Sequence, residues 1–264
     1  MSKVLGADYG ATVLNQDIYE LSSTQKHRLG TRLVRGNRTF MYAKAGATLN
    51  TDLLAWNNRI QDIAYRTVAA NAAAGDTELK ITTTTGDGQS EDGAIAAHEL
   101  EGGNIIIFPG SENSINMGIV DNTVVTASSH EITIKLDGAL PIAITTSMSA
   151  ECVSSAYKDV RASTSGSPHR SFVGLPMRVA TTTNPYVWLQ TWGPCWIAPA
   201  NGFGEHNAGG TAHSHQLVAR YGGNVQVSKD EDTNSEWQQN VGFVMFRGPS
   251  NAQGAPFMML QISP

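Results

Sequence analysis

The chain has 264 residues, of which only 16% are charged, and its 18 basic and 23 acidic side chains give a net charge of −5. An ordinary soluble domain carries about 25% charged residues, and a surface this poor in charge suits a protein that packs against other chains. The small number of basic residues argues against nucleic acid as a main partner. No apolar run approaches the ~18 residues of a membrane-spanning helix. Asp8 interrupts any signal-peptide core, so we expect neither a membrane partner nor Sec export.

Short runs rich in Val, Ile, Thr and aromatic residues, separated by Gly, Asn and Asp, predict an all-β protein. We expect two β-sandwich-like or barrel-like modules with an extended N-terminal arm. Residues 1–25 form the predicted arm, and residues 75–145 form a small β module. Residues 163–168 are the best candidate for a linker.

The arm is polar and weakly patterned. Leu14, Ile18 and Leu21 have helical spacing, so a short helix over Asn15–Leu21 and an arm that is disordered in the isolated protein are both open. The functional alternative is an arm that becomes ordered on the surface of a neighbouring molecule.

The clearest local signal is a hairpin over Thr31–Lys44, with Gly36-Asn37 as a two-residue turn. In its second half, apolar side chains occupy both alternating positions, which predicts a strand covered on both faces. Residues 47–74 are compatible with one helix or two strands, and Asn57-Asn58 in the middle favours the strands. Five or six strands within residues 75–144 predict a small barrel or sandwich.

Candidate catalytic or metal-binding motifs are weak. His213 and His215 have the spacing of two metal ligands on a strand, but exposed loop histidines are the simpler interpretation. Cys152 and Cys195 are too few for a disulfide scaffold or a four-cysteine zinc site, and they fit a reducing compartment. Cys195 follows Gly193-Pro194 beside Trp196, which indicates a buried thiol rather than a nucleophile. We therefore expect no catalytic residue, no metal and no cofactor.

Trp188, Trp192 and Trp196 lie within eleven residues, and we expect this aromatic cluster to belong to a β core. Gly193-Pro194 is expected to end regular strand pairing. The functional alternative is a platform on which sugar rings stack.

Three stretches in this order resemble head decoration or cement proteins of tailed bacteriophages. They are His27–Arg32 with Arg38–Gly46, then Ala72–Thr77 through Gly102–Ile107 to Ile132–Asp137, and finally Asn184–Pro194 with Asn240–Val244. The resemblance covers residues 25–264 in outline and does not include the arm.

This resemblance implies a structural virion protein that binds the outer capsid surface and stabilises it without catalysis. It implies the major capsid protein as partner, a homo-oligomer with a trimer favoured, and a location on the virion after assembly in the host cytoplasm. It also implies that the Thr31–Lys44 hairpin and the Val187–Thr191 strand share one domain, with Gly75–Leu136 inserted. Residues 26–74 and 146–264 would then form the main domain, and residues 75–145 the small inserted domain. The expected capsid or subunit contacts are Tyr9, Leu14, Ile18, Tyr19, Arg32 and Arg38.

Two other functions stay open. One is a carbohydrate-binding host-recognition module of a head or tail fibre, which would use the tryptophans. The other is a virion-associated hydrolase, which only scattered acidic residues and histidines would support.

Overall fold

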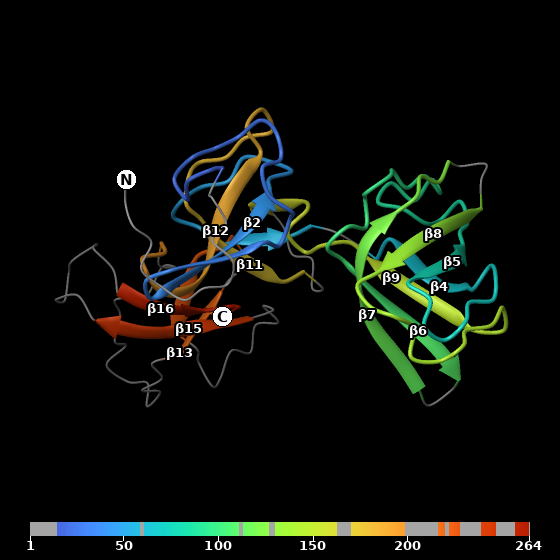
Figure 1. The fold of residues 1–264 in the computed structure, drawn as a ribbon. Coiled ribbons are helices and arrows are strands. Elements are labelled where there is room, and N and C mark those ends of the chain that lie inside the picture. The colour runs from blue at the N-terminus through green and yellow to red at the C-terminus, as the bar shows by residue number, and fades with distance from the viewer. Residues whose placement is uncertain are drawn as a thin grey trace. The chain divides into compact units, whose positions relative to one another are not determined.

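The computed structural model describes residues 15–58, 61–110, 113–126, 130–162, 170–198, 216–219, 222–227, 239–246 and 257–263. The chain divides into two compact units, one formed by Met1–Asn58 with Tyr157–Pro264 and the other by Arg59–Ala156 (Figure 1). Each unit is built on a curled antiparallel sheet that forms a half-barrel, so the predicted all-β fold with two β modules is confirmed.

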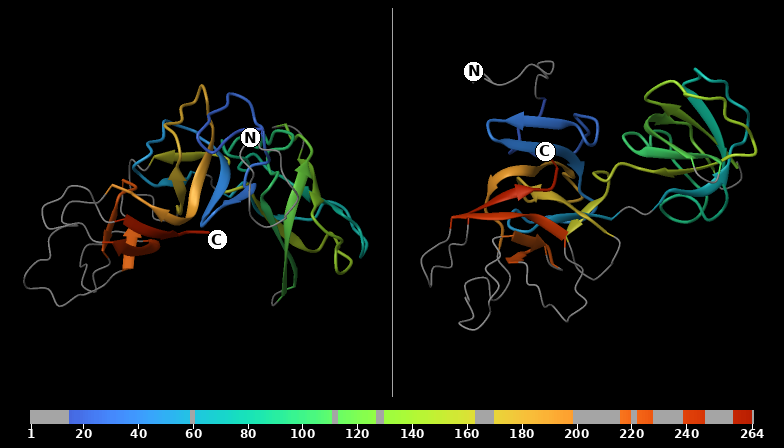
Figure 2. Two further views of the ribbon diagram at one scale, coloured as in Figure 1. Left: turned by 60° about the vertical axis from the view of Figure 1, so that its left-hand side comes forward. Right: turned by 90° about the horizontal axis from the view of Figure 1, so that it is seen from below.

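The larger unit contains a ten-stranded sheet. Its strands are β1 (Arg32–Arg35), β2 (Arg38–Lys44), β3 (Ala55–Asn57), β10 (Val160–Ala162), β11 (Phe172–Pro176), β12 (Tyr186–Cys195), β13 (Gln216–Ala219), β14 (Val225–Val227), β15 (Gln239–Phe246) and β16 (Phe257–Gln261). The main path runs β10-β3-β11-β12-β16-β15-β13-β14, and the β1–β2 hairpin joins it because β2 pairs with β12. The hairpin and β12 therefore lie side by side, as the two views in Figure 2 also show.

The smaller unit contains a six-stranded sheet in the order β4-β9-β6-β7-β8-β5. Its strands are β4 (Ile63–Thr67), β5 (Glu78–Thr82), β6 (Asn104–Gly110), β7 (Asn113–Asn122), β8 (Glu131–Leu136) and β9 (Ser149–Val153). The two end strands approach each other just beyond β4, where Val68 and Ile81 form an isolated antiparallel bridge. Their contact closes the sheet around a core that includes Ile105, Ile107 and Ile134, all fully buried.

The observed unit boundaries correct the predicted ones. The smaller unit runs from Arg59 to Ala156, whereas the sequence analysis placed it at residues 75–145. The difference arises because β4 pairs with β9, and β9 with β6, so both flanking strands belong to the small sheet. In β9 only Ala150 and Cys152 are fully buried, and such a short alternation among small residues gives a weak sequence signal.

Several local predictions are confirmed. Arg35 and Arg38 pair across the Gly36-Asn37 turn, and Gly36 has the positive φ of 64° that the turn requires. Phe40 and Met41 point to opposite faces of β2 and are both buried, so the strand is covered on both faces as expected. Residues 47–74 contain two strands, β3 and β4, rather than a helix.

The prediction that strand pairing ends at Gly193-Pro194 was wrong. β12 continues to Cys195, and Pro194 pairs with Met259 of β16. Pairing between β12 and β2 stops at Trp192 and Thr39, so the prolyl nitrogen needs no partner on that side.

Candidate interaction surface

The part of the predicted arm that the structure describes is fixed to the larger unit by Gln16. This side chain is 2% exposed. Its Nε2 donates to the carbonyls of Glu20 and Tyr186 at 2.9 Å, and its Oε1 accepts from the Tyr42 hydroxyl at 2.7 Å. Trp188 Nε1 donates to the Gln16 carbonyl at 3.1 Å. Residues 15–25 are therefore part of the folded unit, which corrects the prediction of an arm extending to residue 25.

Ile18 completes this attachment. Its side chain is fully buried in a cluster with Leu29, Phe40, Tyr42 and Trp188. An isoleucine buried within its own chain cannot contact a capsid or a second subunit, so its assignment as a contact residue was wrong. The other two apolar candidates of the arm, Tyr9 and Leu14, lie outside the described residues.

His27 belongs to the same aromatic cluster. Its ring lies 5.1 Å from that of Tyr42 and 5.3 Å from that of Trp188. Its Nε2 is buried and has no hydrogen-bond partner among the residues that the structure describes. Burial lowers the pKa of His27 below its ordinary value of 6.5, because the charged ring loses hydration without gaining an acceptor.

Arg35 and Arg38 pair across the hairpin and share one of its faces, and together with Tyr19 they form what we call the basic hairpin surface. Arg32 and Val34 lie on the opposite face, because side chains alternate along β1. Tyr19 is 48% exposed and Val34 45%. The Arg35 guanidinium donates to the Asp17 carboxylate at 3.2 Å. Arg38 lies over the Phe40 ring and reaches the Tyr19 hydroxyl at 3.4 Å. Three of the predicted contact residues, Tyr19, Arg32 and Arg38, are thus placed on the N-terminal segment and the adjoining hairpin.

The sequence carries a signal for this surface that the sequence analysis missed. Between Leu21 and Thr51 there are six Lys and Arg residues and no Asp or Glu. The other 233 residues carry 12 basic and 23 acidic side chains, a net charge of −11. The hairpin is therefore a basic region in an otherwise acidic protein, and it is complementary to an acidic partner.

Of the three tryptophans predicted to form one cluster, the structure places only Trp188 deep in the core, fully buried. The other two are not part of its cluster, because Trp192 and Trp196 follow four and eight residues further along an extended strand that ends at Cys195. Trp192 is half-buried and Trp196 is 40% exposed, so the prediction of a buried cluster was wrong for Trp196.

A second exposed aromatic residue lies near the same end of β12. Cys195 and Met258 are the last pair of the β12–β16 ladder; Trp196 follows Cys195, and Phe257 precedes Met258. Phe257 is 42% exposed. Two exposed aromatic residues at one end of a ladder offer apolar area to a planar or ring-shaped partner.

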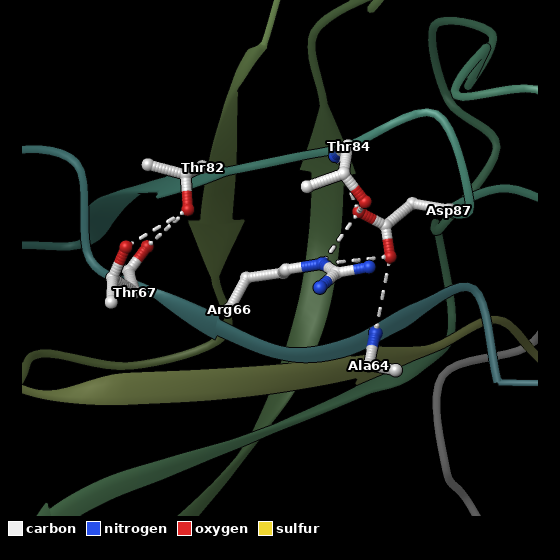
Figure 3. Close-up of polar contacts among 6 residues, drawn as sticks. All are labelled: Ala64, Arg66, Thr67, Thr82, Thr84 and Asp87. Atoms are coloured by element: carbon white, nitrogen blue, oxygen red, sulfur yellow. Dashed lines mark hydrogen bonds and ion pairs between the residues drawn. The ribbon is translucent and has the colours of Figure 1, made fainter.

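The smaller unit holds a buried ion pair (Figure 3). Arg66 Nε donates to the two carboxylate oxygens of Asp87 at 2.8 and 3.1 Å, and the Asp87 side chain is 1% exposed. The same carboxylate accepts from the Thr84 amide at 2.6 Å and the Ala64 amide at 3.4 Å. All its contacts are internal, so its role is to tie the 83–103 connection to β4.

A second contact at this place joins the two end strands of the small sheet. The Thr82 hydroxyl lies 3.0 Å from the carbonyl oxygen and 3.0 Å from the hydroxyl of Thr67 (Figure 3). Together with the Val68–Ile81 bridge, it holds β4 and β5 together.

The cysteines behave as predicted for core thiols. Cys152 and Cys195 are free and buried. Burial raises the pKa of the Cys195 thiol to about 12, and burial near Asp62 and Asp87 raises that of Cys152 well above its usual range. Neither forms a reactive thiolate at neutral pH.

Other candidate motifs find no support in the described part of the chain. No group of three or more His, Cys, Asp and Glu is placed there to hold a metal ion. His213 and His215 lie outside it. No helix in it is long and apolar enough to cross a membrane.

Comparison of the chain with models of known protein families, with curated proteins and with solved structures found no match.

Proposed function

We propose that the protein is a structural component of a bacteriophage virion that binds the outer surface of the capsid and stabilises it. The observation that carries the proposal is the basic hairpin surface, an exposed aromatic and arginine-bearing surface on a firmly packed β unit. Gln16 and Ile18 hold the segment that contributes Tyr19, so these groups are oriented before a partner arrives. Preorganised side chains lose little conformational entropy on binding.

The all-β architecture and the low charge support this function. A cement protein gains free energy from area shared with several capsid subunits, and a standard interface buries about 1,600 Å². Attachment at several points multiplies weak contacts through avidity. A surface with few charges also has a small desolvation cost when it is covered.

The experiment is to add purified protein to undecorated heads of the phage. Co-sedimentation with the heads, and survival of decorated heads at a higher temperature or a stronger osmotic shock, would support the proposal. Heads that neither bind the protein nor gain resistance would refute it.

Carbohydrate recognition is the second candidate function, favoured by the exposed Trp196 and Phe257 at one end of the β12–β16 ladder. Binding on a glycan array that disappears in Trp196→Ala but persists in Val179→Ala would support it. Val179 is a suitable control because it is also an exposed apolar residue of the larger unit, at 51%.

A further inference from the structure

The two units differ sharply in charge. Arg59–Ala156, the smaller unit, contains 4 basic and 13 acidic residues and has a net charge of −9. The rest of the chain contains 14 basic and 10 acidic residues and has a net charge of +4. The net charge of −5 is therefore the sum of a basic unit and an acidic one.

Within each unit the charge is concentrated in one stretch. The acid-free stretch between Leu21 and Thr51 contains the basic hairpin surface. Between Ile81 and Ile134 the smaller unit contains eight Asp and Glu residues and no Lys or Arg. Most of these acids lie in residues 83–103, which link β5 to β6 and which we call the acidic connection.

The tip of the acidic connection is exposed and has a defined shape. Glu91 and Asp92 are exposed. The Glu91 amide donates to the Gly88 carbonyl at 3.1 Å, and the Asp92 carboxylate accepts from the Ala94 amide at 2.9 Å. Buried Asp87 anchors the base of the tip through its pair with Arg66. These carboxylates are therefore presented from an ordered loop, as the arginines are from the hairpin.

The larger unit itself shows how the hairpin binds a carboxylate, because Arg35 holds Asp17 at 3.2 Å. Each copy of the chain thus carries both an arginine surface that accepts carboxylates and a carboxylate loop with no basic residue nearby in sequence. We propose that two copies associate head to tail, with the acidic connection of one copy bound to the basic hairpin surface of the next. This inference does not depend on capsid binding.

Such a contact joins two different surfaces. Repeated head-to-tail contacts of this kind form a closed ring when the rotation between copies permits, and a trimer is one such ring. The contact is rich in exposed charge, so its strength should fall as salt shortens the screening length from about 14 Å at 0.05 M to about 4 Å at 0.5 M.

The test is sedimentation velocity of the full-length protein at about 0.05 M and about 0.5 M salt, without heads. We expect an oligomer at low salt that dissociates at high salt. Arg38→Glu and Glu91→Arg should each weaken association by about tenfold or more, because each places like charges opposite one another. Arg178→Glu is the matched control, since Arg178 is exposed on the same unit but outside the acid-free stretch, and it should have little effect.

The decisive variant combines Arg38→Glu with Glu91→Arg. Exchanging the two charges should restore association to within about threefold of the original protein. A monomer at low salt, an oligomer insensitive to salt, or a combined variant no stronger than the single ones would overturn the proposal, provided that all variants keep the same thermal transition. Because heads are absent, the result is independent of the capsid-binding experiment.

Discussion

Replacing Ile18 tests whether the N-terminal segment belongs to the folded unit. Ile18→Ala removes a fully buried side chain from its contacts with Phe40, Tyr42 and Trp188. Large-to-small core replacements of this kind cost about 2–5 kcal/mol. For a domain of 150–250 residues each kcal/mol lowers Tm by about 2–4 °C, so a cost of about 3 kcal/mol predicts a fall of about 6–12 °C.

The assay is thermal unfolding followed by near-ultraviolet circular dichroism, which reports the packing of Tyr42 and Trp188. Tyr19→Ala, one residue further along the chain, is the matched control because Tyr19 is 48% exposed, and it should lower Tm by about 2 °C or less. Equal and small effects of the two substitutions would refute the packing described for this segment.

Four further outcomes follow from the structure. Deleting residues 1–14 should leave the larger unit folded. Deleting residues 1–25 should destabilise it, because the longer deletion also removes Gln16 and Ile18. Equal thermal unfolding transitions of the two truncated proteins would contradict this. Asp87→Ala should destabilise the smaller unit by about 3 kcal/mol in urea unfolding, because it leaves Arg66 without its buried partner, whereas an exposed replacement such as Glu78→Ala should have little effect. Neither cysteine should react with an aromatic disulfide reagent at pH 8 until the protein unfolds, and rapid labelling of the native protein would contradict their burial. Because the pKa of His27 is lowered in the folded state, the unfolded state binds a proton at a higher pH than the folded state does. The free energy of unfolding should therefore begin to fall as the pH drops through 6.5, and it should continue to fall until His27 titrates in the folded protein. His27→Gln should reduce this loss in urea titrations at several pH values, and an unchanged pH dependence would contradict it.

The strands were predictable where alternation was strong. In β5 and β8 the apolar side chains Leu79, Ile81, Ile132 and Ile134 alternate with polar ones, and the structure places both strands where the pattern predicts them. The hairpin was predictable because Gly36 permits the turn. Alternation within a strand and a glycine in a turn both depend only on residues that are close together in the sequence.

The errors came from contacts that a local pattern does not contain. The boundaries of the small domain were predicted wrongly because β9 pairs with both β4 and β6, which are distant from it in the sequence. Trp196 was expected in the core because it neighbours apolar residues, but it lies one residue beyond the end of β12 and is 40% exposed. Neither effect is visible from the spacing of residues alone.

The candidate surface was only partly predictable. Tyr19 and Arg38 were proposed as contacts because they lie in the arm and the hairpin, and the structure brings them within 3.4 Å of each other. Ile18 was assigned wrongly, because a polar segment gave no sign that Gln16 would anchor it to Tyr42 and Trp188. The distribution of charge along the chain would have identified the basic hairpin without a structure.

The central claim is that the protein is a capsid-binding virion component, and its most direct test is the stoichiometry of the protein on phage particles. Quantitative mass spectrometry of purified virions, together with rebinding to undecorated heads, would measure it. We predict a copy number close to that of the major capsid protein, and saturable rebinding that raises the temperature at which heads rupture. A few copies per particle, or heads that rupture at the same temperature with and without the protein, would contradict the claim.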